Sequence, residues 1–218
     1  MINILEYLPL LLKGSLITIT AWVISAILSL TIGTLLGIAS CRHLTSTFTK
    51  TIIRCYTFIA KGIPAYVQIL IAYFVIPAAL GINIPSFIAA TGALAFCSSG
   101  YVTEIVRSGI NTISQGQWDA CFALGYPIKD ALLRIILPQT FKNILPSLFG
   151  ELEQLLKSTS LLATIGITEL TRTGMNIISR ELNPIPIYLI IASIYLLFSA
   201  LLQAIIIYTE KRSHHVSR

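Results

Sequence analysis

Long runs of apolar residues without a single charged side chain alternate along the chain with shorter polar segments. Four such runs cover residues 15–40, 64–85, 85–103 and 183–209. A helix needs about 20 predominantly apolar residues to cross the hydrocarbon core of a bilayer, and each run can supply them. The pattern therefore predicts four membrane-spanning helices.

A fifth run, residues 144–170, is long enough to span but contains Glu151, Glu153 and Lys157. It could instead form an amphipathic helix on the membrane surface. Because its charges do not keep to one helical face, we favour a span whose charged side chains face protein. The predicted fold is all-α and polytopic, with five transmembrane helices. They cover approximately residues 15–40, 64–80, 85–107, 144–165 and 185–209.

The composition agrees with this pattern. Hydrophobic residues make up 55% of the chain and charged residues only 11%, whereas a soluble domain has about 25% charged residues. Neither an internal repeat nor a soluble domain is recognisable. Residues 1–218 are therefore predicted to form one transmembrane domain in a lipid bilayer.

Lysine and arginine predict the orientation of the chain. With the N-terminus outside, the inner segments hold all but four of the 15 Lys and Arg residues, as the positive-inside rule requires. The four exceptions are Lys13, Lys157, Arg172 and Arg180. This bias explains the net charge of +6, so no nucleic-acid partner is predicted, and it places the C-terminus in the cytoplasm.

The connecting segments are expected to differ in structure. Residues 45–60 have apolar residues at a helical period and are expected to lie along the inner membrane surface. Residues 1–14 are expected to form a short outer segment with a turn. Residues 77–85 and 171–186 are expected to be outer loops, with Glu169 and Arg172 as gate or docking residues.

One inner segment, residues 115–138, is unusually polar for this chain. Its first part can form a short helix, which Gly125 can end with a left-handed turn. Pro127 suits the first turn of a second helix, and Pro138 predicts its end or a kink. This helix–glycine–helix unit could present side chains to a partner below the membrane, or it could be an ordinary amphipathic loop; the residues alone favour neither.

The same segment resembles the signature loop of permease subunits of bacterial ABC importers. That signature is Glu-Ala-Ala, three residues, Gly, nine residues, Ile, one residue and Leu-Pro. Here the spacing is intact, with Asp in place of Glu and Cys in place of the second Ala. The matching residues are Asp119, Ala120, Cys121, Gly125, Ile135, Leu137 and Pro138.

Further segments resemble the polar amino acid uptake branch of these permeases, which includes histidine, arginine and glutamine permeases. They are residues 6–20, 60–74, 99–120 and 155–170. Lys61 and Ile63 depart from the branch pattern. The resemblance covers residues 6–212 and is closest to arginine permease subunits.

The resemblance implies an assembly in the bacterial inner membrane. A second permease subunit, identical or homologous, would pair with this chain, two ABC ATPase subunits would sit below, and a periplasmic amino-acid-binding protein would deliver substrate. Asp119, Ala120, Cys121 and Gly125, with Leu137 and Pro138 after them, would form the coupling helix and its hinge. The chain has no P-loop, no metal-ligand spacing and no predicted catalytic residue, so ATP and Mg would be bound by the partner ATPase.

Charged residues inside a span usually face a cavity or one another, which makes two groups candidate substrate ligands. Lys157 is predicted near the middle of the fourth span, with Thr159 and Ser160 beside it, where it could meet a carboxylate. The alternative is an ion pair with Glu153, four residues earlier. Glu153 departs from the family pattern, and an extra acid hints at a cationic substrate.

Tyr101 and Glu104 form the second group, on one face of the third span, with Arg107 one turn on. Glu104 could accept an ammonium or a guanidinium group of a substrate. A local ion pair between Glu104 and Arg107 is the alternative.

The predicted function is therefore the membrane subunit of an ATP-driven amino acid importer, with a basic amino acid such as arginine as substrate. Two other classes stay open: a passive channel or ion-driven carrier, and a non-transporting scaffold that recruits a soluble partner.

Overall fold

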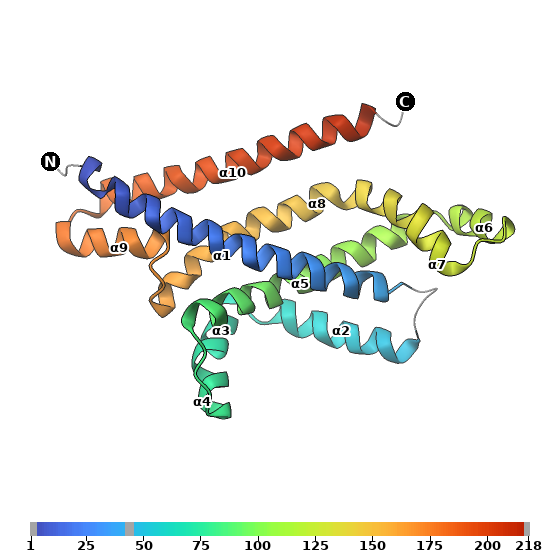
Figure 1. Ribbon diagram of the computed structural model, residues 1–218, viewed down its shortest axis with the longest axis horizontal. Helices are drawn as coiled ribbons and strands as arrows, with labels where there is room; N and C mark the ends of the chain where they lie inside the picture. Colours follow the sequence, from blue (N-terminus) through green and yellow to red (C-terminus); the bar gives the residue numbers. More distant parts are fainter. Residues whose placement is uncertain (1–3, 42–45, 216–218) are drawn as a thin grey trace. The chain divides into compact units, whose positions relative to one another are not determined.

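The computed structural model describes residues 4–41 and 46–215, with side chains for residues 6–41 and 46–208. All regular elements in these ranges are helices (Figure 1). In chain order they are α1 (Ile4–Ala39), α2 (Thr47–Gly62), α3 (Ala65–Leu70), η1 (Ile71–Val75), α4 (Ile76–Leu80), α5 (Ser86–Thr112), α6 (Gln115–Ala123), α7 (Ile128–Ala131), η2 (Leu132–Ile136), α8 (Leu137–Ser158), η3 (Thr159–Ile165), α9 (Leu170–Glu181) and α10 (Pro184–His215). Of the short elements, η1 and η2 are π-helical and η3 is a 3₁₀ helix.

The chain divides into two compact units, and the long helices α1, α5 and α8 contribute a part to each. Unit 1 contains Met1–Ile27, Pro64–Ala95 and Leu152–Tyr208, and unit 2 contains Leu28–Ile63, Phe96–Glu151 and Thr209–Arg218. That residues 1–218 act as one transmembrane domain stays a prediction.

Unit 1 has two apolar cores. The first, between α1, α3, α5 and η3, includes Ala21, Ile69, Leu94 and Leu162. The second, between α1, α9 and α10, includes Leu11, Leu170, Ile177 and Ile187. The second core corrects the expectation of an outer loop at residues 171–186. Its apolar residues recur at a helical spacing, so most of that segment folds as α9 and buries them.

Unit 2 is built around α5. Its core brings together the second half of α1, α5, α6 and the first half of α8, and includes Val102, Val106, Trp118, Ile136 and Ile144. Gly33 and Gly37 of α1 face Val102 and Val106, and a Cβ on either glycine would come within 3.0 Å of the valine side chain. Two glycines four residues apart let helix backbones approach closely, as in membrane helix pairs.

Two prolines follow directly on π-helical turns. Just before Pro77, the Ile76 N–H donates to the Ile71 carbonyl, and just before Pro138, the Leu137 N–H donates to the Leu132 carbonyl. A proline ring clashes with the carbonyl four residues earlier, and a wider turn moves that carbonyl aside. The helix therefore continues past Pro138 as α8, where the sequence predicted an end or a kink.

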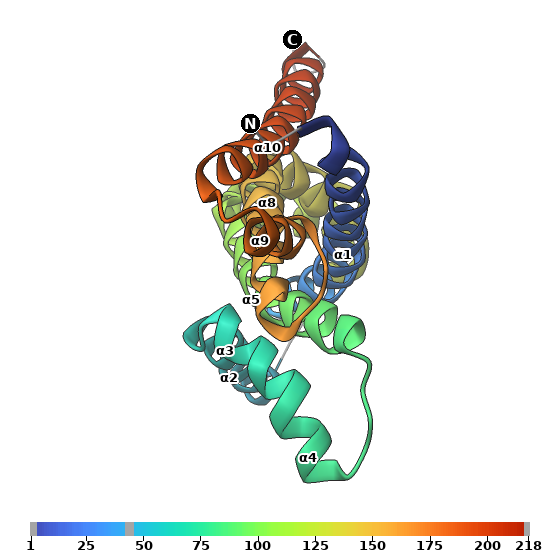
Figure 2. The ribbon, with the colours of Figure 1, turned by 90° about the vertical axis from the view of Figure 1, so that its left-hand side faces the viewer.

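The N-terminal expectation also needs correction. Residues 1–14 were expected to contain a turn, but α1 starts at Ile4 and includes Pro9. In the segment predicted as the second span, α3, η1 and α4 follow one another, and the chain returns to α5 through residues 81–85 (Figure 2).

Within the part of the chain that the structure describes, three helices are long and apolar enough to cross a membrane: Glu6–Ala39, Ser86–Thr112 and Pro184–Tyr208. A fourth span is possible if the bent pair Thr47–Gly62 and Ala65–Leu80 counts as one. The predicted count of five is not confirmed, because α8 carries Lys142, Glu151, Glu153 and Lys157.

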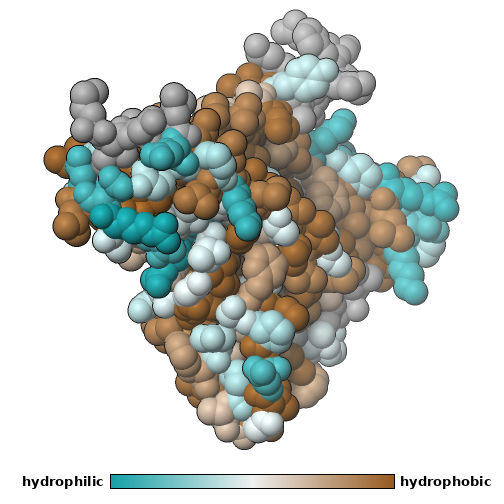
Figure 3. Space-filling model, turned by 60° about the vertical axis from the view of Figure 1, so that its left-hand side comes forward, coloured by the Kyte–Doolittle hydropathy of each residue, from teal (hydrophilic) through white to brown (hydrophobic). Residues whose placement is uncertain are grey.

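The surface has the character that a bilayer requires. Large apolar side chains of α1 and α10 are well exposed, Leu16 and Leu196 among them. Figure 3 shows hydrophobic residues over much of the face in view, with hydrophilic residues gathered mostly toward its margins. Such a surface is unfavourable in water but matches lipid tails, so the described helices are those of a membrane protein.

Candidate functional site

The polar segment 115–138 forms a helical elbow, composed of α6, the turn at Gly125 and α7. Gly125 has φ +77°. Its N–H donates to the Phe122 carbonyl and the Tyr126 N–H donates to the Cys121 carbonyl, both at 3.0 Å. This is the Schellman arrangement, in which a left-handed residue satisfies the last carbonyls of a helix. Pro127 then precedes α7, so the predicted helix–glycine–helix shape is present.

The elbow has an exposed and a buried side. Asp119 and Ala120 are exposed, and the Gln115 Nε2 donates to Asp119 Oδ1 at 2.9 Å. Apolar side chains beside them are exposed as well, with Leu124 at 76%. Exposed apolar side chains next to a carboxylate are typical of a surface that binds another protein.

Two of the six predicted coupling residues instead face the core of unit 2. Cys121 and Leu137 are buried there. Trp118, also buried, anchors α6 from the same side. Pro138 is exposed and is the second residue of α8. The structure therefore brings Asp119, Ala120 and Gly125 to the surface of the elbow, while Cys121 and Leu137 hold it in place.

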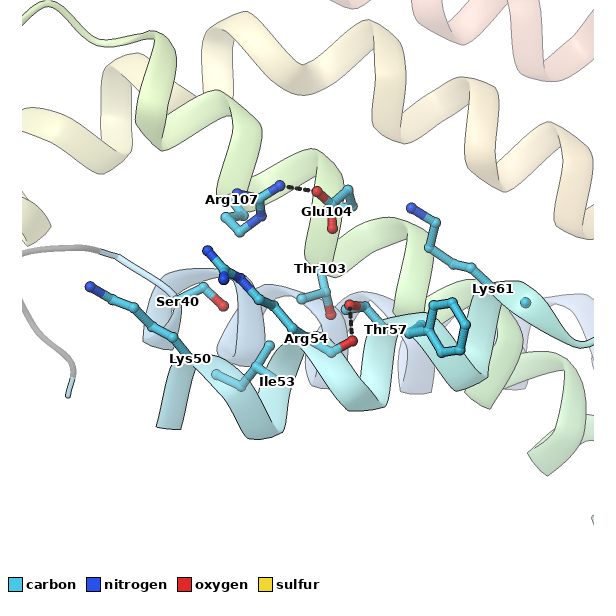
Figure 4. A pocket seen from close by; sticks show the side chains of 11 residues that line it. Ser40, Lys50, Ile53, Arg54, Thr57, Lys61, Thr103, Glu104 and Arg107 are labelled. Atoms are coloured by element: carbon cyan, nitrogen blue, oxygen red, sulfur yellow. Dashed lines mark hydrogen bonds and ion pairs between the residues drawn. The ribbon is translucent and has the colours of Figure 1, made fainter. Parts of the chain in front are cut away.

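A basic hollow of about 420 Å³, called the Arg54 hollow here, lies between α2 and α5. Its charged lining consists of Lys50, Arg54, Lys61, Glu104 and Arg107. Figure 4 shows Arg54 extending from α2 toward α5, where Arg107 pairs with Glu104. The local ion pair considered as the alternative for Glu104 is thus present.

A second hollow, of about 450 Å³, shares Glu104 and Lys61 with the first and is called the Tyr101 hollow. Lys61 Nζ lies 5.5 Å from the centre of the Tyr101 ring, a cation–π contact. Asn143 and Ser147 of α8 contribute further polar groups. Tyr101 and Glu104 therefore line one cavity; that they bind a substrate stays a prediction.

The other candidate substrate ligands belong to unit 1. Lys157 Nζ pairs with Glu153 Oε1 at 2.7 Å, the alternative that the sequence left open. Thr159 and Ser160 donate to the carbonyls of Leu156 and Lys157, a local use of hydroxyl groups. Lys157 lies one residue before the end of α8 at Ser158, where a 3₁₀ helix follows; its position near the middle of a span stays a prediction.

Sequence reasoning placed Glu169 at an outer gate or docking surface, but it is 0% exposed. It caps α9: its carboxylate accepts from the N–H groups of Thr171 at 2.9 Å and Arg172 at 2.7 Å. The Tyr195 hydroxyl donates from 3.1 Å, and Thr18 from 3.4 Å. Burial raises the pKa of Glu169, and these hydrogen bonds oppose the rise. Acidic residues are enriched near the start of helices, so Glu169 directly before an apolar helical repeat could have indicated that a helix begins there.

Glu151 is a second acid whose surroundings the sequence did not reveal. The Ser98 hydroxyl of α5 donates to Glu151 Oε1 at 2.7 Å. The signal was the carboxylate within an apolar run, but its partner lies 53 residues away in the chain, beyond the reach of local patterns.

Residues 29–215 match the family described as binding-protein-dependent transport system inner membrane component. The arginine transport system permease protein ArtQ of Bacillus subtilis is 39% identical over 165 residues, which cover 76% of this chain and 74% of that protein. The glutamine transport system permease protein GlnP of Escherichia coli is 31% identical over 206 residues, which cover 94% and 93%.

Solved structures of ABC transporters resemble this chain as well. An amino acid ABC transporter with histidines matches with a TM-score of 0.88 at 31% identity and covers 96% of this chain and 97% of that one. An inward-facing MetNI methionine ABC transporter matches with a TM-score of 0.81 at 16% identity, over 98% and 99% of the chains, which is a likeness of fold alone. The resemblance to ABC importer permeases that the signature loop indicated is confirmed, and these relatives are permeases rather than enzymes. The chain belongs to the family of binding-protein-dependent transport system inner membrane components.

Proposed function

We propose that this chain is the permease subunit of an ATP-driven importer for amino acids, and that its substrate is a basic amino acid such as arginine. The observation that carries the proposal is the elbow at Gly125, with Asp119 and Ala120 exposed on its α6 arm and the signature spacing intact. The arginine and glutamine permeases among the relatives, and the structure with histidines, support the amino acid class.

The elbow would couple this chain to a partner ATPase, which binds the ATP and Mg. Asp119 offers a carboxylate to a basic or amide group, Ala120 allows close approach, and the apolar Leu124 adds contact area. Because the core side of the elbow is fixed by Trp118, Cys121 and Leu137, a displacement of the elbow is transmitted to α5 and α8. The helices would then alternate between inward-open and outward-open states.

Substrate recognition would use the Tyr101 hollow. Glu104, which pairs with Arg107, offers a carboxylate to the ammonium or guanidinium of the amino acid. The Tyr101 ring, which makes a cation–π contact with Lys61, can make the same kind of contact with a guanidinium group of the substrate. Glu153, Lys157, Thr159 and Ser160 would act on the substrate in unit 1, where Lys157 could leave Glu153 to meet a carboxylate.

The full assembly would lie in the bacterial inner membrane with the N-terminus periplasmic and the C-terminus cytoplasmic. It would comprise a second permease subunit, the same or homologous, ATPase subunits and a periplasmic amino-acid-binding protein. The Lys and Arg bias supports this orientation.

Reconstitution tests the proposal. The chain is placed in liposomes with candidate ATPase and binding proteins, and uptake of labelled arginine, lysine, histidine and glutamine is measured with and without ATP. We expect ATP-dependent uptake that is fastest for a cationic amino acid. Uptake that continues without ATP would instead indicate a passive channel, and the absence of both uptake and stimulated ATPase would indicate a scaffold.

A further inference from the structure

The Arg54 hollow is more basic than recognition of an amino acid requires. Its lining carries four cationic side chains and one carboxylate, and that carboxylate already pairs with Arg107. Among the residues that the structure describes, the Arg54 guanidinium has neither an ion-pair nor a hydrogen-bond partner. Cations held this close repel one another, so an anion that enters the hollow relieves a repulsion as well as forming new contacts.

The donors that the hollow offers to an anion are its cationic side chains. Hydroxyl groups of Ser40, Thr57 and Thr103 also line it, but each donates to a backbone carbonyl three or four residues earlier in the chain. A guanidinium donates two parallel hydrogen bonds to a phosphate, so Arg54 and Arg107 can supply the donors that a phosphate needs. At about 420 Å³ the hollow has room for a phosphate and its glycerol.

At the edge of the hollow, α2 exposes one large apolar side chain. Phe58 lines the hollow and is 78% exposed. Phe48, Ile52 and Ile59 are exposed as well, but helical spacing puts them on the opposite face of α2. An exposed apolar side chain does not stabilise a bound inorganic phosphate, whereas it can pack against the acyl chain of a lipid. Basic pockets between membrane helices with lipid at their edge bind anionic headgroups.

We propose that the Arg54 hollow binds the headgroup of an anionic phospholipid, with Lys50, Arg54 and Arg107 around the phosphate and an acyl chain against Phe58. The lipid would hold α2 and α5 together at these cationic side chains. This inference needs only a membrane around the chain, so it stands or fails independently of the proposed substrate.

Spin-labelled phosphatidylglycerol tests the proposal. The full chain is reconstituted in phosphatidylcholine, and the fraction of labelled lipid immobilised by the protein is measured by electron paramagnetic resonance. Wild type is compared with the double variant Lys50→Gln/Arg54→Gln. We expect the preference for phosphatidylglycerol over phosphatidylcholine to fall about tenfold or more.

Two further variants make the result specific. Lys129→Gln/Lys142→Gln removes the same charge from unit 2 outside the hollow and should keep the preference. Lys50→Arg/Arg54→Lys keeps the charge and should keep it as well. An equal loss in the Lys129/Lys142 variant, a loss in the charge-preserving variant, or no loss in the first double variant would overturn the proposal.

Added inorganic phosphate distinguishes the two sources of a phosphate group. If the acyl chains contribute, millimolar phosphate (about the range of weak anion binding) should leave the labelled lipid bound. Displacement of the lipid by inorganic phosphate at these concentrations would show a site for a free anion and overturn the assignment to lipid.

Discussion

Gly37 of α1 lies against Val106 of α5 so closely that a Cβ at position 37 would come within 2.6 Å of the valine Cβ. Gly33 meets Val102 one turn earlier in the same way. Both valines are fully buried. The pair of contacts fixes how the second half of α1 packs on α5 within unit 2.

Gly37→Ala should therefore force the two helices apart. Overpacking of a tight core costs roughly 1–3 kcal/mol, and here the obstacle is a valine branch next to the Thr103 carbonyl rather than a flexible side chain. We expect a lower thermal unfolding midpoint in detergent. Gly150→Ala is the matched control, because a Cβ at position 150 meets nothing within 4 Å; a loss of equal size there would show that the contact is unimportant.

The elbow at Gly125 predicts an effect on coupling rather than on folding. A residue with a Cβ is strained at φ +77° by about 1–2 kcal/mol, and proline cannot adopt this angle. Gly125→Pro should therefore uncouple the partner ATPase from transport while the chain still inserts. The measurement is ATP hydrolysed per amino acid taken up.

Two further variants test whether the effect on coupling is specific to the elbow. Asp119→Lys should uncouple in the same way, because it reverses the exposed charge without changing the turn. Gly116→Ala, in α6, has open space at its Cβ and no positive φ, and should couple normally. Normal uptake in Gly125→Pro and Asp119→Lys would count against the elbow as the coupling device.

Glu104→Gln should alter substrate preference. The change removes the carboxylate of the Tyr101 hollow and keeps its size, so a cationic substrate loses an opposite charge, whereas glutamine loses only a neutral contact. We expect uptake of arginine to fall roughly tenfold relative to glutamine, since hydrogen bonds to charged groups contribute about 1.5–3 kcal/mol.

Glu153→Gln is the comparison for this test, since it removes the acid of the candidate group in unit 1. If that variant changes the preference and Glu104→Gln does not, the specificity lies with Glu153 and Lys157. An unchanged ratio in both variants would exclude both acids as the source of selectivity.

Local patterns predicted some parts of this molecule well. The elbow followed from Gly125, because a helix that ends in the left-handed region nearly specifies glycine, and the charge-free runs predicted α1, α5 and α10. Where local patterns failed, the deciding partner was remote. The apolar side chains of α9 are buried only because α1 and α10 pack against them, and α1 is remote from α9 in the sequence.

The candidate substrate residues show the same limit. The sequence placed Glu104 on one helix with Tyr101 and Arg107. It could not show that three basic side chains of α2 line the same hollow as Glu104; they are Lys50, Arg54 and Lys61. Likewise, counting residues along one helix could not reveal that α8 is followed by a 3₁₀ helix after Ser158, one residue past Lys157.

Glu169 provides the last prediction, a dependence of stability on pH. Because burial raises its pKa above the ordinary value of 4.5, the folded protein favours the protonated carboxyl more than the unfolded chain does. The stabilisation is complete below that ordinary value and is lost as the pH rises through the raised pKa. Glu169→Gln keeps a neutral side chain throughout. The unfolding midpoint of this variant relative to wild type should therefore rise as the pH increases from 4.5 into the mildly acidic range. A relative midpoint that falls instead would mean that the hydrogen bonds from Thr171 and Arg172 outweigh burial, and that the ionised carboxylate is the form that holds α9 in place.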